Sequence, residues 1–286
     1  MFRSPAEVRA LNTFLVEDDM KAHVLECFAT GFVSHFEYQP PEEWGHVDNY
    51  EPLRDRVGQE ALREAMRKQV LLGRMIGGPG WTSETISQFF GGQGFYGIPC
   101  GATEKDGNPR GRIVHDYGHY KAGSYSVNAA HSSTSVTYLK FTEVVQILHK
   151  IKWFVKADLA SGFRQFGTHP VDWRFQVYCN GTNEHYIDIA CPFGKTNSPL
   201  EFCPPVALLA KSVARHYAKS RLSPPPRLGT HVDDIFGGFS NCGSFEKACD
   251  FREYLCKTGK SLTVEFNMKP SKTPMPAKMQ VILGCL

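Results

Sequence analysis

The chain has 286 residues, of which 42% are apolar and 21% are charged, and this composition excludes a disordered chain and allows one or two domains with a substantial core. The net charge of +3 is unevenly spread, since residues 1–60 carry 5 basic and 12 acidic side chains, whereas residues 61–286 carry 27 and 17. The basic part favours phosphate backbones as partners, although a basic surface by itself does not identify a nucleic-acid-binding protein.

Two classes of protein are disfavoured by simple patterns. The chain contains no uninterrupted run of about 18 apolar residues, and its N-terminus lacks the apolar core of a secretory signal. We therefore expect an intracellular protein of the cytoplasm, the nucleus or both, without a membrane partner. The 9 cysteines form no C-x-x-C pair and are odd in number, which argues against a disulfide framework and against a zinc site.

The first half of the chain begins with an acidic extension over residues 1–56, in which 39–44 is the expected linker. A helix is predicted over 58–72, because apolar residues recur there at helical spacing and Gly73 supplies a stop. The glycine-rich stretches at 77–80 and 91–101 predict a loop and a hairpin.

The second half alternates strands, hairpins and helices, which predicts an α+β fold with an antiparallel sheet and helices on one face. Asn-Gly favours a type I′ turn, and Thr142 and Ser244 are the expected N-caps. The predicted elements are a helix at 142–150, a strand at 152–158, a hairpin at 178–189, a helix toward residue 220, a hairpin around 233 and a helix at 244–259.

Two adjacent prolines interrupt the helix expected to end near residue 220. Pro204 and Pro205 fall about five residues into that helix, and each removes a backbone N–H donor. A proline inside a helix costs about 3 kcal/mol or more. The helix is therefore expected either to start later or to kink.

Three carboxylates lie in hydrophobic surroundings. Asp233 and Asp234 lie between apolar β-formers with glycines close behind, which predicts the tip of a hairpin, and Asp158 ends an apolar strand. Converging carboxylates supply oxygen ligands for two Mg²⁺ ions, with Mn²⁺ as a substitute. Asp158 and Asp233 are the expected direct ligands, while Asp234 completes the metal site. Asp18-Asp19 lacks such a frame and is predicted to be a solvated turn.

The carboxylates belong to an ordered set of segments that resembles reverse transcriptases. KADLASGFR at 156–164 looks like motif A, PFGKTNSP at 192–199 like motif B and HVDD at 231–234 like motif C. Within this family, the likeness is greatest to the DIRS-type retrotransposons linked to tyrosine recombinases, and it covers roughly residues 25–286. The segments 272–276 and 281–284 resemble motifs D and E, and 105–117 and 126–128 resemble the fingers segment.

The resemblance implies a right-hand polymerase fold with fingers mainly at 57–150, a palm mainly at 151–286 and no thumb. It implies an RNA-directed DNA polymerase that uses two-metal-ion phosphoryl transfer. The implied partners are an RNA template, a DNA or RNA primer, deoxynucleoside triphosphates, and RNase H and recombinase regions of the same polyprotein.

The resemblance also implies roles for residues that bind the incoming nucleotide. Lys105 and Arg112 match positions that grip the triphosphate, with Arg110 as a rival. Phe163 matches the aromatic side chain under the sugar, where it would exclude a 2′-hydroxyl and favour DNA synthesis. A plain core role stays open for Phe163, as does a solvated hairpin charge for the basic residues.

Four further residues are interpreted through the same likeness. Phe193 is expected near the base and sugar, and Gly194 lets the backbone approach the nucleotide. Lys272 resembles the lysine that protonates departing pyrophosphate, although Lys269 is close by. His231 replaces a residue that is usually Tyr or Phe, either as a pH-sensitive primer contact or as a tolerated ring exchange.

Two other functions remain open on the sequence. The two prolines, and the end of the chain directly after the motif E segment, suit a catalytically silent or truncated polymerase-fold remnant that binds nucleic acid or a protein partner. An RNA polymerase with a similar palm is disfavoured by Phe163.

Overall fold

The computed structural model describes residues 2–34, 36–37, 53–105, 107–120, 125–131, 136–240 and 243–278, apart from the side chains of Lys105, Pro109 and Arg110. Two compact units share the chain. Unit 1 comprises residues 1–2, 30–134 and 166–198, and unit 2 comprises 3–29, 135–165 and 199–286. The expected linker at 39–44 and the motif E segment at 281–284 lie outside the described residues. The division into an extension over 1–56, fingers and palm stays a prediction.

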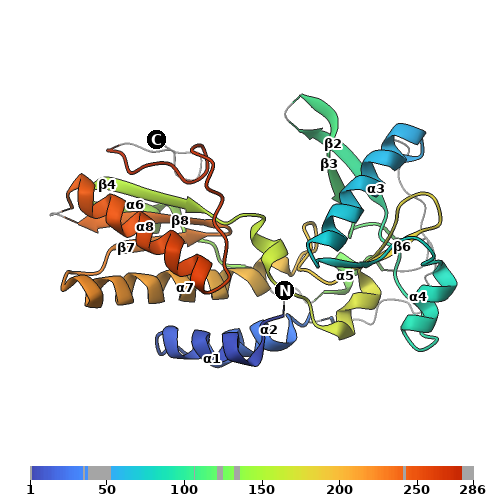
Figure 1. The fold of residues 1–286 in the computed structure, drawn as a ribbon, viewed down its shortest axis with the longest axis horizontal. Coiled ribbons are helices and arrows are strands. Elements are labelled where there is room, and N and C mark those ends of the chain that lie inside the picture. Colours follow the sequence, from blue (N-terminus) through green and yellow to red (C-terminus); the bar gives the residue numbers. More distant parts are fainter. Residues whose placement is uncertain are drawn as a thin grey trace. The chain divides into compact units, whose positions relative to one another are not determined.

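Unit 1 is built on two antiparallel sheets. One has the order β1-β6-β5, from Met75–Gly77, His185–Asp188 and Val177–Cys179, and the other pairs β2 (Cys100–Lys105) with β3 (Asn108–His115) (Figure 1). Strands β5 and β6 confirm the predicted hairpin at 178–189. The helical segments of this unit are α3 (Arg56–Leu71), α4 (Ser83–Phe89), α5 (Val127–Ala130) and the 3₁₀ segment η3 (Pro170–Phe175).

Helix α3 confirms the helix that was predicted over 58–72. It begins after Asp55, whose side chain accepts a hydrogen bond from the Gly58 N–H at 2.7 Å and so satisfies a free donor of the first turn. Leu62 and Met66 are fully buried one turn apart and pack into the same core cluster as Tyr178 of β5. The helix therefore forms where its apolar stripe meets the sheet.

Unit 2 contains one three-stranded antiparallel sheet with the order β4-β8-β7, from Ile151–Asp158, Asp234–Ser240 and Arg227–His231 (Figure 1). Motif C is thus a hairpin, as predicted. The helical segments are α1 (Pro5–Phe14), α2 (Lys21–Thr30), α6 (Phe141–Leu148), α7 (Ser198–Arg221), α8 (Phe245–Ser261) and the 3₁₀ segment η2 (Gly162–Gln165).

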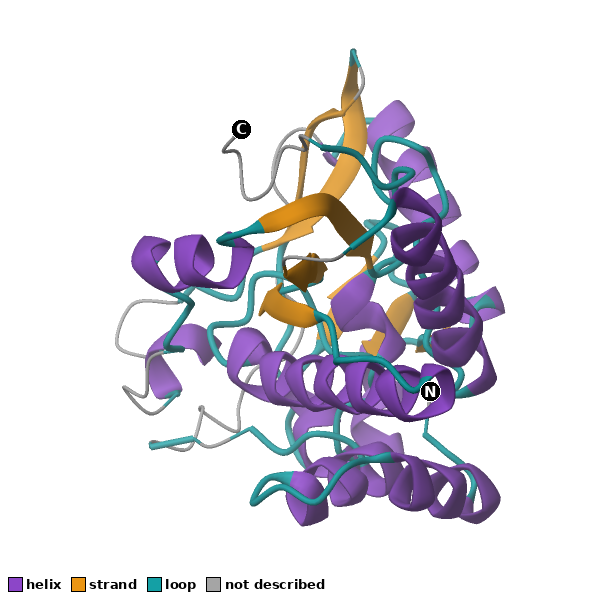
Figure 2. Cartoon of the chain, turned by 90° about the vertical axis from the view of Figure 1, so that its left-hand side faces the viewer, coloured by secondary structure: helices purple, strands orange, loops and turns teal. Residues whose placement is uncertain are grey.

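Helices lie on both faces of this sheet, so the expectation of helices on one face is wrong (Figure 2). Phe236 of β8 packs with Val144 of α6 on one face. Phe239 projects from the other face, where its ring lies 5.7 Å from that of Tyr217 in α7 and 5.8 Å from that of Phe251 in α8. Both faces of β8 carry large apolar side chains, and a helix must therefore pack on each face to bury them.

The first residues of α8 and α6 test the two predicted N-caps. Ser244 is the N-cap of α8, as predicted, and its hydroxyl accepts the Lys247 N–H at 3.1 Å. Helix α6 begins after Lys140 rather than Thr142. The reason is that Glu143 reaches back to accept the Lys140 N–H at 2.6 Å, which satisfies a donor at the start of the helix.

Helix α7 runs from Ser198 through Pro204 and Pro205 to Arg221, so the helix does not start later, and the alternative of a kink stays a prediction. The prolines remove two backbone donors, yet Phe202 and Val206 on either side of them are almost fully buried. Packing of the apolar face outweighs the lost hydrogen bonds. Neither this 24-residue helix nor any other described helix is long and apolar enough to cross a membrane.

Candidate active site

The register of unit 2 gathers three carboxylates at one end of its sheet. Asp158 is the last residue of β4 and lies directly opposite Asp234, the first residue of β8. Asp234 also pairs with His231 at the end of β7, which leaves Val232 and Asp233 as the two residues of the connecting turn. Asp158 and Asp234, which are far apart in the sequence, are therefore neighbours because β4 and β8 are antiparallel.

The turn that carries Asp233 is held in a strained conformation. Val232 has a φ of +52°, which is rare for a β-branched side chain and costs roughly 1–3 kcal/mol. The Leu159 N–H donates to the Asp233 carbonyl oxygen at 2.9 Å and ties the turn to the end of β4. A turn that stays strained must be fixed by its surroundings, and strain of this kind gathers at functional sites.

Gly162, in η2, provides the space beside this turn. A Cβ atom at Gly162 would lie 2.8 Å from the Cβ of Asp233 and 2.9 Å from the Cζ of Phe202. Both distances are well below the carbon–carbon optimum of about 3.5–4.0 Å. Only glycine therefore allows η2, the motif C turn and α7 to meet here without a shift.

The electrostatics of the site concentrate negative charge. Burial raises the pKa of Asp233, and the charge of Asp158 raises it further. Burial also raises the pKa of Asp234, against the opposing effect of the Lys156 ammonium group. Asp234 Oδ1 is buried, makes no hydrogen bond and lies 3.4 Å from Lys156 Nζ. Additional positive charge would therefore stabilise the ionised forms of these carboxylates.

The segment around Lys272 packs onto the same end of the sheet. The Thr273 hydroxyl oxygen accepts the Asp158 N–H at 3.1 Å, and Thr273 is fully buried. This contact brings Lys272 Nζ to 3.4 Å from Asp158 Oδ1. Because the Lys272 side chain is 53% exposed, the ion pair contributes little stability and leaves the ammonium group accessible.

The donor set suits a hard divalent cation. Carboxylate oxygens are the ligands that Mg²⁺ and Mn²⁺ prefer, and Asp158, Asp233 and Asp234 supply such oxygens at one end of the sheet. Across the described part of the chain, however, no group of three or more His, Cys, Asp or Glu side chains is arranged to hold a metal ion. The two lysines instead supply the nearest positive charge to Asp158 and Asp234.

Two aromatic residues near these carboxylates make ring contacts within unit 2. Phe163 is 7% exposed, and its ring lies 4.5 Å from that of Phe202 in α7. The His231 ring lies 5.1 Å from that of Tyr138, and its Nδ1 atom is buried without a hydrogen bond. A core contact is thus present for Phe163, and its sugar-selecting role stays a prediction.

The other nucleotide contacts implied by the resemblance lie in unit 1. Gly194 has a φ of +94°, and a Cβ there would lie 2.9 Å from the His115 carbonyl oxygen, so a glycine is required. Phe193 is 51% exposed. Arg112 is an exposed residue of β3. Lys105 belongs to β2, and its side chain, like that of Arg110, lies outside the described part of the chain.

Three residues of the site were not found from the sequence. Gly162 lies inside motif A, Lys156 opens it and Thr273 follows Lys272, so each stands beside a residue that was selected. Their contacts to Asp233, Asp234 and Asp158 depend on tertiary packing, which leaves no periodic signal in the chain.

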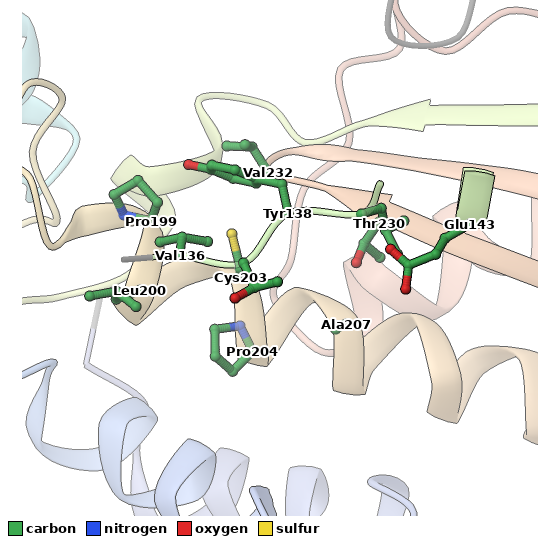
Figure 3. A pocket seen from close by; sticks show the side chains of 12 residues that line it. Val136, Tyr138, Glu143, Pro199, Leu200, Cys203, Pro204, Ala207, Thr230 and Val232 are labelled. Atoms are coloured by element: carbon green, nitrogen blue, oxygen red, sulfur yellow. The ribbon is translucent and has the colours of Figure 1, made fainter. Parts of the chain in front are cut away.

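A cavity of about 370 Å³ opens beside the motif C turn in unit 2 (Figure 3). Its walls include Tyr138, Cys203, Pro204 and Thr230, together with Val232. The cavity therefore borders the strained residue that precedes Asp233.

Comparison with known proteins gives matches at the level of structure alone. No protein-family model and no curated protein matches the sequence. A foamy viral protease-reverse transcriptase in complex with double-stranded DNA is similar, with a TM-score of 0.61 and 14% identity over 98% of this chain and 45% of that one. A selenomethionine-labelled mutant of the prototype foamy virus protease-reverse transcriptase gives a TM-score of 0.59 and 15% identity over 96% and 34%. The native protease-reverse transcriptase of that virus gives a TM-score of 0.53 and 15% identity, again over 96% of this chain and 34% of that one.

These matches identify a reverse-transcriptase-like fold. At such identity the likeness concerns the fold alone, and the chain spans less than half the length of the three foamy virus proteins. The mixed class of helices and antiparallel sheets is confirmed. The fingers and palm layout and the particular likeness to DIRS-type elements stay predictions.

Proposed function

We propose that this chain is the RNA-directed DNA polymerase part of a retrotransposon protein and adds deoxynucleotides to the 3′ end of a primer. The observation that carries the proposal is the pairing of Asp158 with Asp234 at the sheet end, with Asp233 in the turn beside them, in a reverse-transcriptase-like fold. Adjacent carboxylates on two neighbouring strands suit phosphoryl transfer, in which the protein supplies positioning and charge.

In this proposal Asp158, Asp233 and Asp234 hold two Mg²⁺ ions, for which Mn²⁺ can substitute. Such ions, when bound, activate the primer 3′-hydroxyl and stabilise the departing pyrophosphate. Leu159 and Gly162 keep the Asp233 turn in place through the backbone contact and the close approach described above. Lys272 holds a proton on an accessible ammonium group beside Asp158 and donates it to the pyrophosphate.

The remaining roles concern the nucleotide. Lys105 and Arg112 bind the triphosphate, Phe193 and Gly194 contact the base and sugar, and Phe163 excludes ribonucleotides. The proposed partners are a primed RNA template and deoxynucleoside triphosphates, with RNase H and recombinase regions in the same polyprotein. The foamy viral neighbour that was solved with double-stranded DNA and the basic residues 61–286 support nucleic-acid binding.

The test is primer extension on a homopolymer RNA template with Mg²⁺ and labelled deoxynucleotides. Asp233→Asn removes one negative charge at the site, and Asp19→Asn makes the same change at an exposed position of unit 2. We expect the first variant to lose extension by at least about a hundredfold, and the second to match the parent. Calorimetric titration with Mn²⁺ should show weaker binding in Asp233→Asn alone. Equal extension by all three proteins would refute the carboxylate assignment.

A second candidate is a polymerase-fold remnant that binds nucleic acid without chemistry. It is favoured by the ion pairs of Lys156 and Lys272 with the carboxylates, and by the lack of a three-ligand metal group among the described residues. This candidate predicts a folded parent protein that binds the primed template, does not extend it and takes up no Mn²⁺.

A further inference from the structure

Both polar atoms of the Asn128 side-chain amide hydrogen-bond to the motif B loop, residues 192–198. Its Nδ2 group donates a hydrogen bond to the Gly194 carbonyl oxygen at 2.9 Å, and its Oδ1 atom accepts the Thr196 N–H at 2.8 Å. The two bonds join residues 66 and 68 positions apart within unit 1. A single amide that bridges two peptide groups of one loop restrains the loop more strongly than one bond would.

Asn128 is itself well placed to act as an anchor. Its N–H donates to the Tyr117 carbonyl oxygen at 2.9 Å. It belongs to α5, whose N-cap Ser126 accepts the Ala129 N–H at 3.0 Å, and both Ser126 and Val127 are buried. The side chain that reaches the loop therefore starts from a fixed backbone.

Two further hydrogen bonds hold the base of the same loop, residues 192–198. At its base, the Ser198 hydroxyl donates to the Pro192 carbonyl oxygen at 2.6 Å, and the Ser198 N–H donates to the Lys195 carbonyl oxygen at 3.1 Å. Gly194 adopts a left-handed conformation, with a φ of +94°. Phe193, which precedes Gly194 in this loop, is 51% exposed.

We infer that Asn128 is a positioning residue that fixes the motif B loop in the conformation that receives a deoxynucleoside triphosphate. The inference rests on the proposed polymerase function and deepens it, because it assigns to Asn128 an effect on nucleotide affinity through Gly194 and Thr196. Loss of both hydrogen bonds loosens the part of the loop between Gly194 and Thr196, and a nucleotide that binds there must order it, which lowers affinity. We expect the affinity for a deoxynucleoside triphosphate to fall about tenfold.

Two variants of Asn128 separate the two hydrogen bonds. Asn128→Ala removes both, whereas Asn128→Asp keeps the acceptor for the Thr196 N–H and removes the donor to Gly194. Asn12→Ala, at an exposed position of α1 in unit 2, is the control for an asparagine removed elsewhere. The first measurement is hydrogen exchange of the Thr196 amide, which requires no activity. Exchange should be faster in Asn128→Ala than in Asn128→Asp, which keeps the acceptor for the Thr196 N–H but turns a second acceptor oxygen toward Gly194, and Asn12→Ala should keep the parent rate.

The second measurement is the affinity of a deoxynucleoside triphosphate for the protein bound to a primed RNA template whose primer ends in a dideoxynucleotide. Affinity should fall about tenfold in Asn128→Ala, while affinity for the primed template and kcat at saturating nucleotide stay within about threefold of the parent.

The outcomes separate the inference from the proposed function. Unchanged Thr196 exchange in Asn128→Ala refutes the contact itself. Faster exchange with unchanged nucleotide affinity refutes the positioning role, while the polymerase function stands if the parent extends the primer. A folded parent that neither binds the nucleotide nor extends the primer overturns the proposed function, and the role of Asn128 with it.

Discussion

Substitution of Gly162 by alanine tests whether the motif C turn is placed by close packing. The added Cβ would lie 2.8 Å from the Asp233 Cβ and 2.9 Å from the Phe202 Cζ. Normal contacts of about 3.5 Å require a shift of roughly 0.7 Å relative to Asp233 and of roughly 0.6 Å relative to Phe202. Phe202 is fully buried and packed against Phe163, so the turn with Asp233 is the part that yields.

The expected cost has two components. Crowding of a packed site typically lowers the free energy of unfolding by about 1–3 kcal/mol. Displacement of a catalytic carboxylate by close to 1 Å typically lowers turnover by about a hundredfold. Urea unfolding measures the first effect, and primer extension at saturating nucleotide measures the second. Gly162→Ala should therefore be moderately destabilised and severely impaired in extension.

Gly73→Ala is the matched control for this prediction. Gly73 has a φ of +65°, so alanine there strains the backbone, yet a Cβ would meet nothing within 4 Å. The control should lose about 1 kcal/mol of stability and keep its extension rate. Parent-like stability and extension in Gly162→Ala would refute the reasoning. An equal loss of extension in both variants would show that destabilisation alone explains the effect.

Three further predictions concern unit 2. Thr273→Val leaves the buried Asp158 N–H without its acceptor and should cost about 1–3 kcal/mol in urea unfolding, whereas Thr273→Ser should stay close to the parent. Phe163→Val should lower discrimination against ribonucleotides in primer extension if the ring excludes the 2′-hydroxyl. In Asp250, the bidentate hydrogen bonds from Arg221 lower the carboxyl pKa, and Asp250→Asn should remove the stability that this pair provides.

The sign of the Asp250 effect follows from the lowered pKa. A carboxyl whose folded pKa lies below its unfolded value near 4 stabilises the fold above that value, and this contribution disappears as the pH falls through the folded pKa. The unfolding free energies of parent and Asp250→Asn should therefore differ at pH 7 and converge toward pH 2. A difference in unfolding free energy that grows as the pH falls would contradict the assignment for Asp250. Unchanged selectivity between deoxynucleotides and ribonucleotides in Phe163→Val would contradict the exclusion of the 2′-hydroxyl by the Phe163 ring.

Local patterns predicted much of the secondary structure. The helical spacing before Gly73 corresponds to α3. The Asn-Gly pair at 180–181 does lie in the β5–β6 hairpin, but Cys179 pairs with His185, so the loop spans residues 180–184 and the expected two-residue type I′ turn is wrong. The apolar frame of Asp233 and Asp234 corresponds to the β7–β8 hairpin. These features follow from the sequence because periodicity, turn chemistry and caps act over a few neighbouring residues.

Packing overruled local rules at two helices. Two prolines predicted a later start or a kink. Helix α7 starts at Ser198 and continues past them, with Phe202 buried on its apolar face, so the later start is wrong and the kink stays a prediction. Helices were expected on one face of the sheet only, yet α6 covers the face opposite to α7 and α8, where Val144 packs against Phe236. Neither outcome follows from the composition of the helix itself, since each depends on what lies against it.

The sequence alone selected Asp158, Asp233 and Asp234 as candidate ligands, through their residue type and hydrophobic frame. Only the tertiary structure set the pairing of Asp158 with Asp234, the close approach of Gly162 to Asp233 and the two hydrogen bonds of Asn128 to the motif B loop. The physical reason is that strand register and side-chain contacts join residues far apart in the chain. Their geometry arises from how whole elements pack, and short sequence patterns carry no record of it.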